Sequence, residues 1–411
     1  MKLTYANKKG SIRIEAFMLL VLAAFFNDSI LIYGKAVAGA IFGYNAFVEA
    51  LIPSLFVILL VFSLKKILPN IKPAHVIFVL LSLYVITLCY VAYPNNRQYY
   101  NDYNMDLLFT QAIPFFFLGL SVTFDKRLFK VMTVLSYIAI VVNLLYVFYF
   151  TQTRDMENDA MGWAYVALLP TLISICAIFE QKNFRGLVVS AIFSIIGALY
   201  IVSMGTRGPI IITCVYFLAM LWYKSNKKWS MKLLASGIIV LLVVFLYSGA
   251  YINVLISLRA VLVQNGLSSR TIDLFLEGEM LTHMSGRDVI YETIMERLKE
   301  RPFIGFGTFG EWQFINYTAH NVWLELCAHY GYVFGTLLLA VHVFITLKAF
   351  LKSKNPLAKS MILLFACFAY VRSVFGGDYL YFEFTFLLGL SLHEIRAAKR
   401  YKAKVPIDST V

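Results

Sequence analysis

Runs of about 20 apolar residues recur along the chain, and they constrain its fold more than any other feature of the sequence. A run of about 20 residues crosses a bilayer core of ~30 Å as an α-helix. Backbone polar groups in lipid must be satisfied within the segment, and the runs are uniformly apolar rather than alternating, so helices are predicted rather than barrel strands. The sequence, with 60% hydrophobic and 14% charged residues, therefore predicts an all-α, polytopic membrane protein.

Twelve membrane-spanning helices are predicted, with ends uncertain by several residues. Basic residues precede the first run, as in a signal peptide, but no convincing small-residue cleavage site follows, so an uncleaved span is expected. The predicted spans are 14–33, 41–64, 74–93, 107–124, 128–150, 161–179, 184–203, 206–223, 231–253, 328–351, 358–375 and 379–393.

The positions of Lys and Arg predict the orientation of these spans. Twenty-five of them fall in the predicted inner segments and five in the short outer segments, which places both termini in the cytoplasm. This asymmetry explains the net charge of +13, so nucleic acid is not an expected partner. The five cysteines are scattered without CxxC spacing, which indicates packing residues rather than a disulfide framework or a metal site.

One long polar stretch interrupts the apolar pattern and is predicted to lie outside the membrane. The chain then has three parts within a single membrane domain: helices one to nine in 1–253, an outer loop with an amphipathic helix in 254–320, and helices ten to twelve with a cytoplasmic tail in 321–411. No internal repeat or long linker is visible. The chemistry is expected on the outer face, in and around this loop.

Arginine dominates the basic residues of the predicted outer face. Nine of eleven there are arginine, compared with five of twenty-five inside. The planar guanidinium suits bidentate contacts with phosphate, so an anionic, phosphorylated ligand is expected. The alternative is that these arginines pair with nearby acidic residues or lipid headgroups. The nine are Arg97, Arg154, Arg207, Arg259, Arg270, Arg287, Arg297, Arg301 and Arg372.

Two of these arginines have distinctive neighbours. Arg207 lies between Gly205 and Gly208 at the outer junction of two predicted spans, where glycines allow a ligand to approach the backbone. The other reading is an interfacial arginine that reaches toward water. Arg287 lies at the predicted start of a loop helix, in Ser285-Gly286-Arg287-Asp288, where free backbone donors favour an anion.

That loop helix is expected to bury Ile290, Ile294 and Leu298 and to end before Pro302. Its acidic and basic residues, with Arg297 among them, more simply form a solvated face. The segment Gly305-Phe306-Gly307 is then expected to form a flexible turn.

His320 and Asn321 come directly before the tenth predicted span, at the membrane face. A histidine with an ordinary pKa near ~6.5 can accept a proton from a sugar hydroxyl at neutral pH. A lone histidine is more often a satisfied polar residue, as is expected for the other histidines of the chain. Glu325 follows Asn321 by four residues on the same helical face, as a structural partner or a substrate contact.

Together these motifs resemble the O-antigen ligase and polymerase superfamily. The resemblance rests on Gly-Thr-Arg-Gly at a helix junction, Ser-Gly-Arg opening a loop helix, Arg-Pro-Phe-Ile-Gly-Phe-Gly, and Ala-His-Asn-Val-Trp-Leu-Glu. It covers roughly 200 to 340 in detail, and the remainder only in topology. It implies a GT-C-like fold, with the large outer loop between helices nine and ten.

The resemblance also implies an activity: transfer of a glycan from an undecaprenyl-pyrophosphate donor to an acceptor hydroxyl at the outer face of a bacterial inner membrane. It assigns Arg207 and Arg287 to the pyrophosphate and His320 to the acceptor. It also implies that no metal or other cofactor takes part and that the anomeric carbon is inverted. Partners would be the lipid-linked donor, a glycan acceptor, the bilayer and a chain-length regulator. Candidate substrate contacts are Arg270, Asn321, Glu325, Gly205, Gly208 and Gly305.

The motifs do not separate a polymerase of O-antigen or capsule repeat units from a ligase that transfers glycan to lipid A core. The compact segment between Arg287 and His320 favours the polymerase. A flippase or transporter of lipid-linked oligosaccharide is the alternative of another class. Its polar pathway would have to use the intramembrane charges Asp28, Glu49, Arg372 and Glu383.

Overall fold

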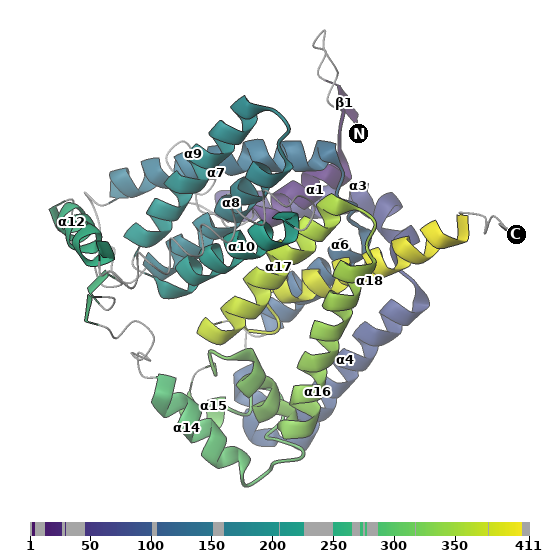
Figure 1. Cartoon of the computed structure of the whole chain (residues 1–411). Coiled ribbons are helices and arrows are strands. Elements are labelled where there is room, and N and C mark those ends of the chain that lie inside the picture. The colour runs from purple at the N-terminus through teal and green to yellow at the C-terminus, as the bar shows by residue number, and fades with distance from the viewer. Residues whose placement is uncertain are drawn as a thin grey trace, which may run out of the picture. The chain divides into compact units, whose positions relative to one another are not determined.

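The computed structural model is helical apart from one short antiparallel hairpin, β1 (Lys2–Thr4) with β2 (Arg13–Glu15) (Figure 1). The all-α prediction is thus confirmed for the described part of the chain, with this hairpin as its exception. The structure describes residues 2–4, 13–26, 29, 46–100, 105–150, 160–204, 206–225, 250–264, 272–273, 276–277, 287–316, 318–376 and 378–404.

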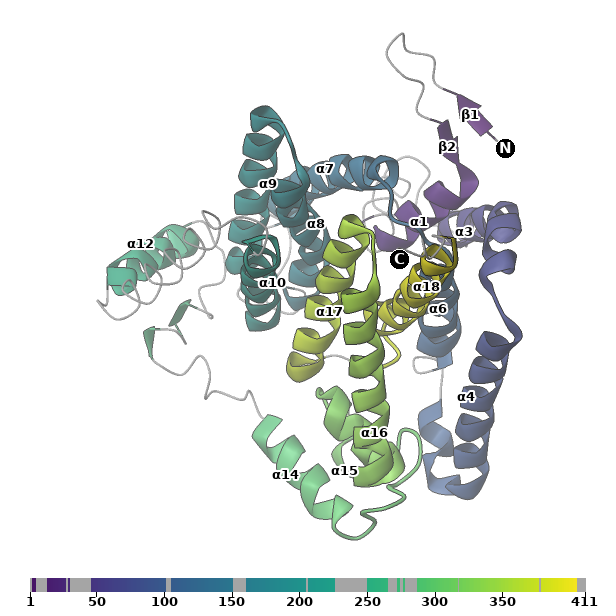
Figure 2. The same ribbon diagram turned by 45° about the vertical axis from the view of Figure 1, so that its right-hand side comes forward.

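The chain forms two compact units, and each is described by itself. Unit 1 comprises residues 1–64 and 125–283, and unit 2 comprises 65–124 and 284–411. In unit 1, helix α8 contacts α7, α9 and α10 (Figure 2), and its Leu168, Leu172 and Ile173 are fully buried. The helices of unit 1 are α1 (Ala16–Phe25), most of α3 (Ala46–Ile67), α7 (Lys126–Phe150), α8 (Ala160–Glu180), α9 (Phe184–Ser203), α10 (Arg207–Ser225) and α12 (Ala250–Gln264).

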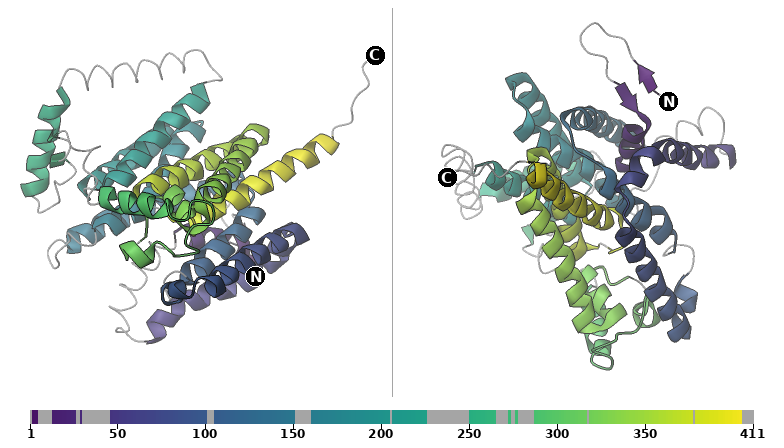
Figure 3. Two further views of the ribbon diagram at one scale, coloured as in Figure 1. Left: turned by 90° about the horizontal axis from the view of Figure 1, so that it is seen from below. Right: turned by 90° about the vertical axis from the view of Figure 1, so that its right-hand side faces the viewer.

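Unit 2 contains the loop region and the C-terminal helices. Its α16, α17 and α18 contact one another, and their green-to-yellow ribbons lie side by side (Figure 3). Helix α6 packs along α18, and α14 packs against α16. The elements are η1 (Leu68–Asn70), α4 (Pro73–Ala92), η2 (Pro94–Tyr100), η3 (Leu107–Ala112), α6 (Ile113–Ser121), α14 (Arg287–Leu298), α15 (Trp312–Ile315), α16 (Val322–Lys352), α17 (Pro356–Phe375) and α18 (Phe382–Lys404).

Seven helices in the described part are long and apolar enough to cross a membrane, so the chain is a multi-pass membrane protein. The predicted range 231–253 lies outside the described residues except for its last four, which begin α12. Since α1 and η3 with α6 are shorter apolar helices, the number twelve stays a prediction. The seven are Pro73–Ala92, Lys126–Leu145, Gly162–Glu180, Phe184–Ser203, Arg207–Ser225, Val322–Lys352 and Pro356–Phe375.

Helix α16 is broken at Gly331, where φ is 80° and ψ is 166°. The Trp323 Nε1–H donates to Thr336 Oγ1 at 3.0 Å, although residues thirteen apart in a straight helix lie about 20 Å from each other. A Cβ on Gly335 would lie 2.6 Å from the Cys327 nitrogen. The short helix 322–330 therefore folds back on the longer helix 332–352.

The segment after α14 fills this break. The amides of Phe306 and Gly307 donate to the carbonyls of Ala328 and His329 at 2.7 and 3.0 Å, so the end of the short helix is capped by another part of the chain. Gly305 has a positive φ of 62°, and a Cβ there would lie 2.5 Å from the Ala328 carbonyl oxygen. The predicted turn exists, and its backbone is hydrogen-bonded rather than free.

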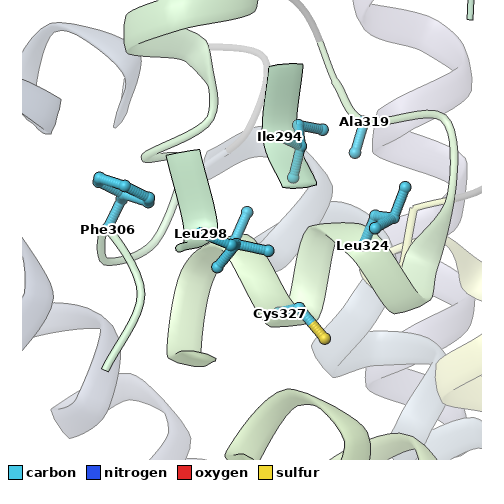
Figure 4. Packing of buried hydrophobic residues seen from close by; sticks show 7 residues of the cluster. Ile294, Leu298, Phe306, Ala319, Leu324 and Cys327 are labelled. Carbon is cyan, nitrogen blue, oxygen red and sulfur yellow. The ribbon is translucent and has the colours of Figure 1, made fainter. Parts of the chain in front are cut away.

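The buried face of α14 packs on the short helix of α16. Figure 4 shows Ile294 and Leu298 beside Leu324 and Cys327. Ile294 and Leu298 are fully buried, and Ile290 packs partly buried at the same cluster. The predicted apolar face of the loop helix is therefore confirmed, and it anchors α14 next to the segment that carries the candidate histidine.

Candidate functional site

Arg287 is the first residue of α14, as predicted. The expected N-cap residues Ser285 and Gly286 lie outside the described residues. The helix ends at Leu298, four residues before Pro302. Arg287 is half-buried at the end of the helix where free backbone donors and the positive end of the helix dipole favour an anion.

His320 adopts a left-handed backbone conformation, with φ of 51°. Such a conformation is uncommon outside glycine, costs roughly 1–3 kcal/mol, and clusters at functional sites. The Tyr291 hydroxyl of α14 donates to the His320 carbonyl oxygen at 3.3 Å. The Thr318 hydroxyl lies 3.4 Å from His320 Nδ1. The histidine is thus held by contacts on both its backbone and its ring.

Arg287 influences the His320 ring electrostatically. Burial, and after it the positive charge of Arg287, lower the pKa of His320 below its ordinary 6.5. The imidazole is therefore neutral at neutral pH and has a nitrogen that can accept a proton. Burial also raises the pKa of Tyr291, so its hydroxyl remains a donor. Arg287 and His320 therefore lie near enough in unit 2 to interact electrostatically.

The connection between α17 and α18 lies against this site. A Cβ on Gly376 would lie 3.8 Å from His320 Nδ1, and the Val374 carbonyl oxygen is 3.5 Å from the Tyr291 hydroxyl. Close by in sequence, Arg372 forms an ion pair with Glu383 at 2.7 Å. Two of the four charges that a transport pathway would need are therefore paired with each other.

Arg207 belongs to unit 1. It begins α10 just after α9 ends at Ser203, and Gly208 and Pro209 are buried in the first turn. The predicted helix junction is therefore confirmed, but the convergence of Arg207 with the Arg287–His320 site stays a prediction. Gly205 and Arg270 lie outside the described residues.

Asn321, Glu325 and Gly305 have structural roles in unit 2, and their predicted substrate contacts stay predictions. The Asn321 side chain caps α16 by accepting a hydrogen bond from the Leu324 amide at 3.2 Å. Glu325 is 1% exposed and lies in a buried polar cluster rather than on the surface. Gly305 is buried in the turn that caps the short helix.

That buried cluster, here called the acid–histidine cluster, comprises Glu311, Glu325, His329 and Asp378. Glu311 Oε2 lies 2.6 Å from His329 Nε2, and the ligand atoms of Glu311, Glu325 and His329 lie within 4.8 Å of one another. Asp378 hydrogen-bonds with Glu325, and burial raises the pKa of Asp378 to about 6. The sequence shows no dense carboxylate–histidine group, but the fold assembles one.

Sequence reasoning missed this cluster because its members come from three segments. Glu325 and His329 are four residues apart on one helical face, which is the one local signal that could have joined them. The other histidines meet expectation where the structure describes them: His342 contacts the Tyr370 hydroxyl and the Phe384 carbonyl. The packing interpretation agrees with the buried positions of Cys176, Cys327 and Cys367, whereas Cys89 is half-buried and Cys214 is exposed.

Comparison with known proteins finds a family model that matches part of the chain. Residues 191–340 match the model of a family described as O-antigen ligase. This range contains Arg207, Arg287, His320 and Asn321, and it confirms the resemblance noted from the motifs. No match is found among curated proteins.

Proposed function

We propose that the chain is a member of the O-antigen ligase and polymerase superfamily, because residues 191–340 match the model of a family described as O-antigen ligase, and that it transfers a glycan from a lipid pyrophosphate to an acceptor hydroxyl. The observation that carries the proposal is the Arg287–His320 site, in which a neutral, strained histidine lies under the influence of an arginine at a helix start. An anion site and a proton acceptor next to each other suit this reaction.

In the proposed step, the acceptor oxygen attacks the anomeric carbon from the face opposite the leaving group, which inverts that carbon. The bond from the anomeric carbon to the pyrophosphate oxygen breaks, and its electron pair leaves with the undecaprenyl pyrophosphate. The hydroxyl proton passes to the His320 ring. Arg287, with Arg207, stabilises the negative charge that develops on the leaving group.

We propose that the acceptor is a second lipid-linked glycan, so that the protein is a polymerase of O-antigen or capsule repeat units. The segment between Arg287 and His320 supports this, because much of it packs within unit 2: α14 covers the short helix of α16, and 305–311 is buried. The matching family, described as O-antigen ligase, does not separate this activity from the alternative, a ligase that transfers glycan to lipid A core.

The proposed location is the bacterial inner membrane, with both termini in the cytoplasm and the site on the outer face. A chain-length regulator protein is a proposed partner. A transporter is the weaker reading, since Arg372 and Glu383 neutralise each other and the Arg287–His320 site is built from a loop region.

Reconstitution separates these activities. The full chain in liposomes is supplied with undecaprenyl-pyrophosphate-linked repeat units, with or without lipid A core, and the products are resolved on a gel. A ladder of lengthening glycan without lipid A core is expected. Transfer only to lipid A core would replace the polymerase with a ligase, and translocation without any covalent transfer would overturn the proposal.

A further inference from the structure

The acid–histidine cluster is buried, and its groups converge. Glu311 and His329 are fully buried, and Glu325 is 1% exposed. Within the described part of the chain, Glu311 Oε1 and Glu325 Oε2 are buried with no hydrogen-bond partner. Buried carboxylate oxygens are costly unless a hydrogen-bond donor or a cation satisfies them. Each of these two acids therefore has an oxygen available to a ligand inside the protein.

The hydrogen bonds of His329 leave its Nε2 as a lone-pair donor. The Phe309 amide donates to Nε2 at 3.0 Å, which requires a lone pair on that nitrogen, and a cation bound at Nε2 would take this lone pair in place of the Phe309 amide. The other nitrogen, Nδ1, lies 3.1 Å from the Tyr379 hydroxyl, so the ring proton belongs there and can be donated to Tyr379. An outer partner that fixes the tautomer in this way is typical of histidines that bind metals.

In that tautomer, Nε2 faces Glu311 Oε2 at 2.6 Å. Two lone pairs at this distance repel each other unless a positive group lies against both. When both acids are ionised, two carboxylates and one neutral imidazole together carry a charge of −2, which a single divalent cation neutralises, and binding releases the proton that Glu325 shares with Asp378. Ligands bonded to one metal at ~2.1 Å lie roughly 3 Å apart, so binding needs only a small separation of these two atoms.

We propose that Glu311, Glu325 and His329 bind one divalent transition-metal cation, Zn²⁺ or Mn²⁺. Mixed oxygen and imidazole donors suit these ions, whereas Mg²⁺ and Ca²⁺ take oxygen ligands. Asp378 hydrogen-bonds with the ligand Glu325 from outside the site. The cation would lie among buried side chains, so its proposed role differs from that of the arginines.

The cation would join two segments near His320, and Asp378 would connect a third segment to them. Glu311 lies just before α15, Glu325 and His329 lie on the short helix that follows His320, and Asp378 lies two residues after Gly376, which faces the His320 ring. Glu325 and His329 are ligands, and His320 acts on substrate. The bound metal therefore positions the candidate histidine without taking part in proton transfer.

Metal content tests the proposal independently of glycan transfer. The full chain, with a tag that lacks histidine, is purified in detergent without chelators, and its metals are measured by plasma mass spectrometry. About one equivalent of Zn²⁺ or Mn²⁺ is expected. Glu325→Gln and His329→Gln should lose most of it. Glu300→Gln, a substitution of an exposed acid in the same loop region, should retain it.

A second measurement guards against variants that fail to fold. After the wild-type chain is stripped with a chelator, Zn²⁺ or Mn²⁺ should raise its thermal midpoint, whereas Mg²⁺ and Ca²⁺ at the same concentration should not. Wild type without bound metal and without this shift would overturn the proposal and leave a proton-sharing network. Equal metal content in wild type, Glu325→Gln and His329→Gln would also overturn it, because the ion would then lie elsewhere.

Discussion

Replacing Gly331 by alanine tests the break in α16. A Cβ at this position would lie 2.3 Å from the Phe303 carbonyl carbon and 2.4 Å from its oxygen, and both are backbone atoms that no rotamer change can move. Overpacking of this kind costs about 1–3 kcal/mol. The backbone at φ 80° and ψ 166° is essentially restricted to glycine and adds roughly 1–3 kcal/mol.

The two terms together predict a loss of about 2–6 kcal/mol from Gly331→Ala, a large part of the ~5–15 kcal/mol that stabilises a typical protein. Unfolding in detergent, followed by heat or by denaturant, measures this loss. Gly162→Ala is the matched control, because a Cβ on Gly162 in α8 would meet nothing within 4 Å. Alanine is favoured over glycine in helices by up to about 1 kcal/mol, so this control should be as stable as wild type or more so.

Equal stability of the two variants would refute the reasoning, because a continuous α16 would accept alanine at position 331 without strain. The capping bonds from Phe306 and Gly307 could not then be formed as described. We also expect Gly331→Ala to reduce glycan transfer more than Gly162→Ala does, since the broken helix begins two residues after His320.

Three further predictions concern the site. Glycan transfer in the ladder assay should be abolished by Arg207→Ala, Arg287→Ala and His320→Ala, each with normal membrane insertion. Arg297→Ala should have a mild effect, because the exposed ion pair of Arg297 with Glu300 is worth only ~0–1 kcal/mol. Equal loss of transfer in all four variants would contradict the assignment. Tyr291→Phe removes a hydrogen bond of ~0.5–1.5 kcal/mol to the His320 backbone and should lower kcat/KM roughly 2- to 10-fold at an unchanged protein level. An unchanged kcat/KM would show that Tyr291 does not contribute to the site. Burial and the charge of Arg287 lower the pKa of His320 below 6.5. A plot of kcat/KM against pH should therefore be flat near neutral pH and fall only below pH 6.5, where the ring becomes protonated. A fall in kcat/KM that begins above pH 6.5 would argue against His320 as the proton acceptor.

Local patterns in the sequence predicted local structure well. Hydropathy located the described apolar helices, because a segment in lipid must satisfy its own backbone. The spacing of Ile290, Ile294 and Leu298 predicted the buried face of α14, since helical periodicity depends only on neighbours along the chain. Arg287 at a helix start and Arg207 at a helix junction follow from the same kind of local signal.

Features that depend on distant segments could not be predicted in this way. In the sequence, α16 reads as one apolar run with no sign of a break. The amides that cap its short first part belong to Phe306 and Gly307, which lie outside the helix. Asn96, more than two hundred residues away, donates to the Phe306 and Thr308 carbonyls. The position of Tyr291 beside His320 is equally a product of tertiary packing.

The acid–histidine cluster could not be predicted from the sequence for the same reason. Glu325 was assigned to a substrate or to Asn321 from spacing along one helix. Its surroundings in the fold are Glu311, His329 and Asp378, which come from three separate segments. Residue types and spacing in the sequence indicated an anion site on the loop region. The grouping of the buried polar side chains became visible only in the folded structure.

The folded-back start of α16 changes how this helix matches the thickness of a bilayer. An unbroken helix of 31 residues would be about 46 Å long, well beyond a hydrocarbon core of ~30 Å, and would have to tilt steeply or thicken the membrane around it. The part after Gly331 is about 31 Å long, which matches a hydrocarbon core of ~30 Å without either adjustment. Reporters fused at positions 323 and 330 should accordingly report the same side of the membrane.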